Sequence, residues 1–209
     1  MAAILKHIET IQNAATSQQP TVTLTASPVG YLLVAVASSK STNTPTVDGT
    51  GWTQQMVVTN GISCRSVAWT KLIASGDSST YTFDFTASVE NIVGISVFQL
   101  AASSPFYNDC GGNTGSGTKP ATRTAGGGTA TDKLAFCFSA DATTVSSTGS
   151  GYVTLDETTG AASNQLISFD SGDGAAQACT WNYSGTTTYA AGNITLIAAY
   201  GKAHKLGEV

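Results

Sequence analysis

The sequence has few charged residues and almost no histidine, and both shortages restrict its chemistry. Only 11% of its 209 residues are charged, against about 25% in an average globular protein. The two histidines, His7 and His204, lie near the ends of the chain, and no Gly-x-Ser-x-Gly motif accompanies them. Because a catalytic triad needs a histidine held beside its nucleophile, we do not expect a hydrolase of that type.

Basic clusters and long apolar runs are also missing. The nine Lys and Arg residues are scattered along the chain, and the formal net charge is −4. Nucleic-acid binding needs a concentrated positive surface, and a membrane-spanning helix needs about 20 consecutive apolar residues. Lys6, His7 and Glu9 interrupt the first apolar stretch, which makes it a poor secretory signal. We therefore expect neither nucleic acid nor membrane as a partner.

Residues that could bind a metal or act on a sugar are present but badly spaced. The four cysteines, Cys64, Cys110, Cys137 and Cys179, show no CxxC spacing and have no nearby histidine to complete a zinc site. We predict reduced thiols, with one disulfide as the open alternative. The segment 170–174, DSGDG, resembles part of a calcium loop but lacks a distal glutamate, and a hairpin turn between strands 164–170 and 177–183 explains it better. Most other acids fall in turn-like segments, so we expect no cofactor, no metal site and no catalytic residues.

Strand-forming residues alternate with turn residues along most of the chain. Runs rich in Val, Ile, Thr and aromatics are separated by Gly, Ser, Asn, Asp or Pro, and this pattern predicts an all-β fold. In 81–85, YTFDF, the aromatics share one face of a strand. We predict a jelly-roll-like β-sandwich of ten to eleven antiparallel strands, at 21–26, 31–37, 52–58, 62–70, 80–86, 92–100, 133–139, 151–156, 164–170, 177–183 and 193–200.

The sequence also suggests how the domain is organised. We predict an N-terminal arm at 1–20, one sandwich domain at 21–201, and a C-terminal tail at 202–209. The segment 103–132 is rich in Gly, Ser and Thr without apolar periodicity, and it is predicted to be a long loop. In the arm, Ile4, Ile8, Ile11 and Ala15 follow helical spacing, although an edge strand is the alternative.

Aligning the chain on itself at an offset of about 100 residues indicates two pseudo-repeated halves, near 21–102 and 121–201. The matches pair Leu32 with Leu134, Gly51-Trp52 with Gly151-Tyr152, Val67 and Trp69 with Ile167 and Phe169, Phe83 and Phe85 with Trp181 and Tyr183, and Asn91-Ile92 with Asn193-Ile194. Chance is the alternative in so Thr-rich a sequence. If the repeat is real, the two halves interlock into one pseudo-symmetric sandwich of jelly-roll type, with strands from both halves in each sheet.

Three segments together resemble a group of β-sandwich proteins from tailed phages and prophages. They are VGYLLVAV at 29–36, TPTV with GWT at 44–53, and YTFDF at 81–85. The similarity covers roughly 21–200. Tyr31 stands where the group has Asp, and the proline expected just before Gly51 is absent. The resemblance implies a virion structural protein and transfers no catalytic residues.

Two non-enzymatic roles follow from this resemblance. The first is a capsid decoration, or cement, protein on the phage head, which binds the major capsid protein and copies of itself, as a trimer in some cases, and stabilises the assembled shell by mass action. The apolar arm residues Ile4, Leu5, Ile8 and Ile11 are the candidate partner contacts. The alternative is a tail-associated module that binds a host receptor or surface glycan. Its candidate sugar contacts are Tyr107 and Tyr189, which we expect in loops.

Overall fold

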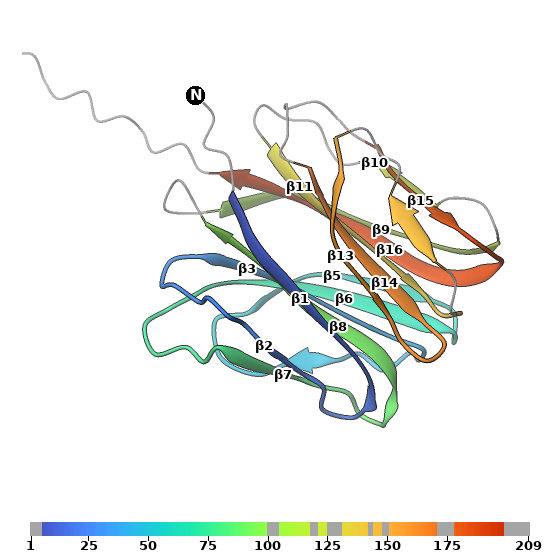
Figure 1. The fold of residues 1–209 in the computed structure, drawn as a ribbon, viewed down its shortest axis with the longest axis horizontal. Coiled ribbons are helices and arrows are strands. Elements are labelled where there is room, and N and C mark those ends of the chain that lie inside the picture. Colours follow the sequence, from blue (N-terminus) through green and yellow to red (C-terminus); the bar gives the residue numbers. More distant parts are fainter. Residues whose placement is uncertain are drawn as a thin grey trace, which may run out of the picture.

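The computed structural model of the chain describes residues 6–99, 105–117, 121–124, 131–141, 144–147, 151–170 and 178–198. Within these residues the fold is all-β, in antiparallel pairs and without a helix, as predicted. Figure 1 shows two groups of strands lying one against the other.

Sixteen strands are assigned in the described residues, eight in each half of the chain. The first half contains β1 (Lys6–Ser17), β2 (Thr21–Thr23), β3 (Leu32–Ser39), β4 (Thr46–Val47), β5 (Thr53–Asn60), β6 (Cys64–Leu72), β7 (Thr80–Asp84) and β8 (Val89–Gln99). The second half contains β9 (Pro105–Gly117), β10 (Ala121–Thr124), β11 (Thr131–Ser139), β12 (Val145–Ser147), β13 (Val153–Thr159), β14 (Asn164–Asp170), β15 (Ala178–Tyr183) and β16 (Thr187–Ala198).

The two halves have the same strand order. The first half forms a five-stranded sheet, β1-β8-β3-β6-β5, and a three-stranded sheet, β2-β7-β4. The second half forms a five-stranded sheet, β9-β16-β11-β14-β13, and a three-stranded sheet, β10-β15-β12. Adding eight to each strand number of the first half reproduces the second half. Each of these sheets contains strands of one half only, so the prediction that each sheet combines strands from both halves is wrong.

Three apolar cores show that the sheets are stacked in four layers. One core lies between the two five-stranded sheets and includes Val34 and Phe98 from the first half and Phe136 and Ile194 from the second. The other two cores lie between each large sheet and its own small sheet. The five-stranded sheets are thus the two inner layers, and side chains on both faces of β3 and β11 are buried. This explains why LLVAVA in β3 is continuously apolar, whereas TYTFD in the outer β7 alternates between buried and partly exposed residues.

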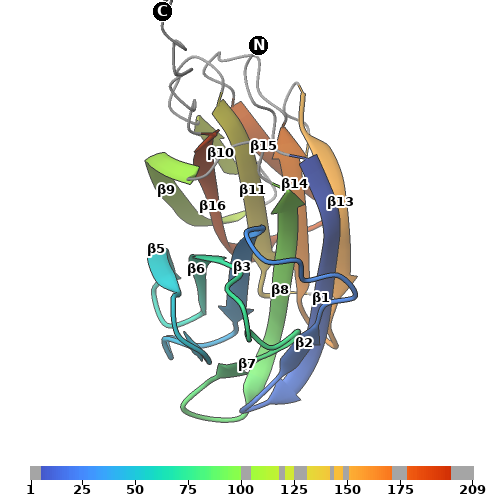
Figure 2. The ribbon, with the colours of Figure 1, turned by 90° about the vertical axis from the view of Figure 1, so that its left-hand side faces the viewer.

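The large sheets stack edge over edge in a reciprocal way. Strand β1 of the first half lies beside β13 of the second, and β5 lies beside β9. Figure 2 shows both pairs, one at each side of the molecule. Exchanging the two halves turns the β1–β13 contact into the β9–β5 contact. The arrangement therefore has the form of a two-fold interface within one chain.

Two glycines let the large sheets approach closely. Gly94 lies opposite Val36 in the first half, and Gly192 lies opposite Phe136 in the second. A Cβ atom on Gly94 would lie 3.2 Å from Ile167 Cδ1, and one on Gly192 would lie 2.9 Å from Met56 Cε. Each glycine therefore makes room for a side chain of the other half.

Polar side chains also connect the halves. Gln165 Nε2 donates to Gln12 Oε1 at 2.7 Å, and Asn60 Nδ2 donates to the Tyr189 carbonyl at 3.0 Å. Near the start of β8, Glu90 Oε1 accepts a hydrogen bond from the Ala162 amide at 2.6 Å. Such bonds fix the relative position of two packed layers, because a buried polar group without its partner is costly.

Several boundaries predicted from the sequence are wrong. Residues 6–17 of the supposed arm form β1, which pairs with β8 along its whole length, so the edge-strand alternative holds there. The supposed loop 103–132 contains β9 and β10, and β9 pairs with β16. Its glycines lack apolar periodicity, but the pairing is made by backbone groups that every residue carries. These additions and several very short strands raise the number of strands above the ten to eleven predicted.

The hairpin predicted across DSGDG is wrong as well. Strand β14 belongs to the five-stranded sheet and β15 to the three-stranded one, so they are not hydrogen-bonded neighbours. Residues 171–177, which include most of the predicted turn, and the predicted tail 202–209 lie outside the described residues.

Candidate functional site at Lys71

A buried lysine–aspartate pair lies near the end of β6. The Lys71 side chain is only 3% exposed, and its Nζ donates to Asp77 Oδ1 at 2.9 Å. The other carboxylate oxygen of Asp77 accepts a hydrogen bond from the Ala74 amide at 2.8 Å. This bond closes the turn between β6 and β7. Asp77 therefore both pairs with the lysine and shapes the turn.

Two aromatic rings flank the Lys71 ammonium. Its nitrogen lies 5.8 Å from the centre of the Trp52 ring and 5.7 Å from that of Tyr81. The rings meet edge to face at 5.4 Å, and Trp52 Nε1 donates to the Asp48 carbonyl at 3.0 Å. Cation–π attraction stabilises an ammonium that has lost most of its water.

Glycines shape the loops around this pair. Gly49 and Gly51, before β5, have φ values of 95° and 85°, and Gly76, before β7, has 88°. This left-handed region is open to glycine and strained for residues with a Cβ atom. The loops 48–52 and 74–80 therefore curve back over Lys71.

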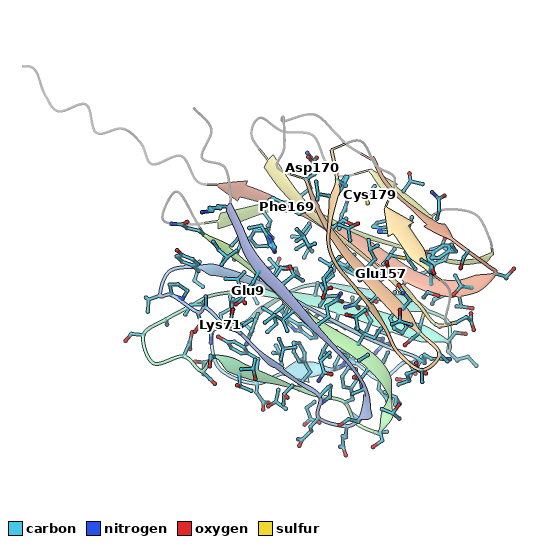
Figure 3. The ribbon with its side chains drawn as sticks, in the orientation of Figure 1. Glu9, Lys71, Glu157, Phe169, Asp170 and Cys179 are labelled. Atoms are coloured by element: carbon cyan, nitrogen blue, oxygen red, sulfur yellow. The ribbon has the colours of Figure 1, made fainter. Side chains whose placement is uncertain are left out.

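Between these loops lies a pocket of about 440 Å³, within the usual range for small-ligand sites. We call it the Lys71 pocket. Its lining includes Asp48, Lys71, Asp77, Ser78, Thr80 and Tyr81. Figure 3 labels Lys71 in the first half, away from Asp170 and Cys179 in the second.

Charge in the Lys71 pocket is concentrated on the buried pair. The hydrogen bond from Lys71 lowers the pKa of Asp77 below its usual 3.8, so this carboxylate is ionised near neutral pH. Burial, followed by the charge of Asp77, raises the pKa of Tyr81, so its hydroxyl keeps its proton. The pocket thus offers a carboxylate acceptor beside ammonium and hydroxyl donors.

The second half contains a related but more enclosed pair. Lys133 Nζ lies 3.6 Å from Asp170 Oδ2, with side chains 0% and 6% exposed, whereas Asp77 is 16% exposed. In the β11–β14 pairing, Lys133 is opposite Asp170. In the corresponding β3–β6 pairing, Lys71 takes the place of Asp170 and is opposite Leu33. Each half thus buries one such pair, and the pair of the first half adjoins the Lys71 pocket.

The thiols are poorly suited to nucleophilic chemistry. Cys64, Cys137 and Cys179 are free and buried, as predicted for reduced cysteines. Burial raises the pKa of Cys64 and of Cys179 to about 12 and raises that of Cys137 further above its usual range. Because the thiolate is the reactive form, these three side chains act as small apolar groups.

The predicted arm contacts are only partly placed. Ile8 and Ile11 lie in β1 and pack, partly buried, against the core between the large and small sheets of the first half. Their apolar surface therefore serves the fold. Ile4 and Leu5 lie outside the described residues.

The predicted sugar contacts are not in loops. Tyr189 is in β16, only 8% exposed, and stacks on Tyr183 at 5.3 Å. Tyr107 belongs to β9, where its backbone pairs with Leu196; its side chain lies outside what the structure describes. The expectation of loop tyrosines is therefore wrong at both positions.

The sequence did not single out Lys71 or Asp77. A lysine in a strand is ordinarily solvated, and Asp77 follows Gly76 in what reads as a simple turn. The one available signal was the pair of glycines before Trp52, in DGTGW at 48–52.

Comparisons with protein-family models, with curated proteins and with solved structures found no match to this chain. In the described part of the chain, no helix is long and apolar enough to cross a membrane. No group of three or more His, Cys, Asp and Glu side chains suited to a metal was found among those same residues.

Proposed function

We propose that this chain is a non-enzymatic structural protein of a phage particle, a decoration or cement protein that stabilises the capsid. It would bind the major capsid protein and copies of itself, most simply as a trimer on the outside of the head. The resemblance of 29–36, 44–53 and 81–85 to phage β-sandwich proteins supports this role.

We further propose that each half is a jelly roll and that the halves are pseudo-repeats. The order β1-β8-β3-β6-β5 beside β2-β7-β4 supports this proposal, because two interlocked Greek keys place β1, β8, β3 and β6 in one sheet and β2, β7 and β4 in the other. Jelly rolls are common in capsid and lectin domains. Further support comes from β-bulges at matching places in β5 and β13. The number of residues that separates Gly94 from Gly192 also separates Phe83 from Trp181.

Exposed apolar residues near the sheet edges carry the assembly proposal. Val57 lies in β5 and Val153 in β13, which are edge strands of the two large sheets, and these side chains are 43% and 66% exposed. Ile62, in the turn between β5 and β6, is 89% exposed. An edge strand presents backbone groups that can pair with another chain, and exposed apolar side chains add favourable burial on association.

The mechanism of stabilisation is mass action. A protein that binds the assembled shell but not its free subunits shifts the equilibrium toward the shell. Many symmetric copies would bind together, so that modest contacts per copy become strong in total. Four stacked layers suit this role, because a well-packed block loses little conformational entropy on docking.

Shell binding by edge variants tests the proposal. Ile62→Asp and Val153→Asp should reduce co-sedimentation with capsid shells, because each places a charge where the proposal buries an apolar side chain. Val29→Asp is the matched control, since Val29 is 65% exposed in the turn before β3. Shell binding unchanged in all three variants would contradict the edge contacts, and absence of the protein from particles in electron micrographs would overturn the phage role.

The contribution of the N-terminus needs a separate variant. Removing 1–15 would remove most of β1 and would therefore test folding rather than binding. Removing 1–5 deletes Ile4 and Leu5 and leaves β1 complete. Loss of shell binding in this shorter deletion would support these residues as partner contacts; full retention would refute that part of the proposal.

The second candidate role is a tail-associated module that binds a receptor or carbohydrate. The observation favouring it is the Lys71 pocket, where aromatic, hydroxyl and carboxylate groups converge. Electron microscopy of particles would separate the two roles, because one predicts the protein on the head and the other on the tail.

A further inference from the structure

The Lys71 pocket contains more polar groups than folding requires. Closing the turn after β6 needs only the bond between the Ala74 amide and Asp77. Burying a lysine beside that turn adds a desolvation cost, which a well-packed apolar residue would avoid. The second half shows that an enclosed pair suffices for the fold, with Lys133 fully buried. The open pocket beside Lys71 therefore invites a functional explanation.

A buried hydroxyl in the Lys71 pocket is left unsatisfied by the fold. Tyr81 lines the pocket and is only 3% exposed. No hydrogen-bond partner for its hydroxyl is found among the residues that the structure describes. Buried polar groups are nearly always hydrogen-bonded in folded proteins, so an occupant of the pocket that offers an acceptor would satisfy this donor.

The charges of the Lys71 pocket restrict the class of ligand. Asp77 neutralises Lys71, and Asp48 adds a second carboxylate to the lining. Two carboxylates against one ammonium disfavour an anionic ligand. The remaining polar groups are short hydroxyls, among them Thr50, Ser78 and Thr80. This lining best fits uncharged groups that can both donate and accept hydrogen bonds.

We infer that the Lys71 pocket binds a neutral, hydroxyl-rich saccharide unit. Neighbouring sugar hydroxyls donate to the Asp77 carboxylate and to backbone carbonyls of the 48–51 loop. Lys71 and Tyr81 donate to ring or hydroxyl oxygens at the base of the pocket. The Tyr81 ring, which lines the pocket, supplies apolar surface beside the ammonium. The inference rests on the second candidate role, and binding by the isolated protein tests it separately from the head or tail placement that microscopy tests.

Nuclear magnetic resonance on the full-length ¹⁵N-labelled chain tests this inference. We expect galactose, glucose, N-acetylglucosamine or lactose, added to about 50 mM because single sugars bind weakly, to shift amide signals at 48–51 and 76–82. N-acetylneuraminic acid and inorganic phosphate should cause no saturable shift there. Shifts from an anion in preference to every neutral sugar would overturn the charge argument, and no saturable shift from any sugar would overturn the site.

Matched variants separate the pocket from weak surface binding. Asp77→Ala should weaken sugar binding by about 10-fold or more, because it removes a charged acceptor. Asp156→Ala in β13 removes a carboxylate from the other half and should leave binding unchanged. If the Asp77→Ala variant does not fold, Tyr81→Phe keeps the ring, removes the unsatisfied hydroxyl and should weaken binding by about 5-fold. Equal binding by Tyr81→Phe and Asp156→Ala would refute the assignment.

Discussion

Replacing Gly192 by alanine tests the close packing of the two large sheets. Its backbone is not in the left-handed region, so alanine can adopt the conformation without strain. The added Cβ would lie 2.8 Å from Phe136 Cζ and 2.9 Å from Met56 Cε and Sδ. Favourable carbon contacts lie at about 3.5–4.0 Å, so Phe136 or Met56 must move.

The magnitude follows from two opposing effects. With free space, glycine to alanine would stabilise the fold by about 0.4–1 kcal/mol, because it reduces the entropy of the unfolded chain. Overpacking a dense core costs about 1–3 kcal/mol. The contacts at Gly192 are short enough that overpacking should dominate. We expect a net loss of about 1–2 kcal/mol in the free energy of unfolding, or a Tm lowered by about 2–8 °C.

Urea unfolding followed by tryptophan fluorescence measures this loss. Trp69 and Trp181 are buried in the first and second halves, so both halves are monitored. In a Met56→Ala background the cost of Gly192→Ala should fall by about 1 kcal/mol, since neighbouring sites are not additive. Gly94→Ala is the comparison variant and should cost less, because its shortest contact is the flexible Gln12 side chain.

A stabilising effect of Gly192→Ala would refute the reasoning, because it would mean that the sheets leave room for a methyl group. An unchanged cost in the Met56→Ala background would show that the contact across the halves is not the cause.

Four further outcomes follow from the core and the site. Phe83→Ala should lower the free energy of unfolding by about 3–5 kcal/mol in urea, since Phe83 is fully buried; a loss below about 1 kcal/mol would argue against that burial. Lys133→Met should lower the free energy of unfolding by about 3–5 kcal/mol, because it removes the ammonium that pairs with the buried Asp170 carboxylate. Adding Asp170→Leu should recover most of that loss; no recovery would indicate that side-chain shape, not charge, causes it. The pKa of Asp77 is lowered from 3.8, so its bond to Lys71 stabilises the fold above pH 3.8, and this stabilisation is lost as the pH falls through the folded-state pKa. Asp77→Asn should remove this part of the acid sensitivity. An acid unfolding transition identical to that of the unmodified protein would contradict the role of Asp77. Burial raises the pKa of Cys64 to about 12, so iodoacetamide at pH 8 should alkylate this thiol in denaturant but not in the native protein. Peptide mass spectrometry measures the alkylation. Alkylation of Cys64 in the native protein would contradict its burial.

The sequence predicted most of the strands because period-two alternation is a local property. The aromatics Tyr81 and Phe83 identify β7 and its buried face without tertiary information. It failed for β9, because a Gly-rich strand carries no side-chain signal and is held by backbone pairing with β16. It also placed Tyr189 in a loop, since an isolated aromatic among Thr and Ala has no clear periodicity.

The matches found by aligning the chain on itself differ in how well they fit the strand pairing. Phe83 and Trp181 occupy corresponding central strands of the two small sheets. The match of Asn91 with Asn193 is out of register, because Asn91 is opposite Ser39 at the end of β3 and Asn193 is opposite Ala135 near the middle of β11. The match of Trp69 with Phe169 is out of register as well, because Trp69 belongs to the core between the large and small sheets and Phe169 to the core between the two large sheets.

The sequence alone determined the all-β class, most strand positions and the burial of the aromatic faces, because side-chain alternation and turn chemistry act between near neighbours. The tertiary structure alone decided that the large sheets stack through Gly94 and Gly192, and that Lys71, Asp77 and Tyr81 line one pocket. These contacts join separate strands and loops, and their energies depend on burial that exists only once the layers have packed.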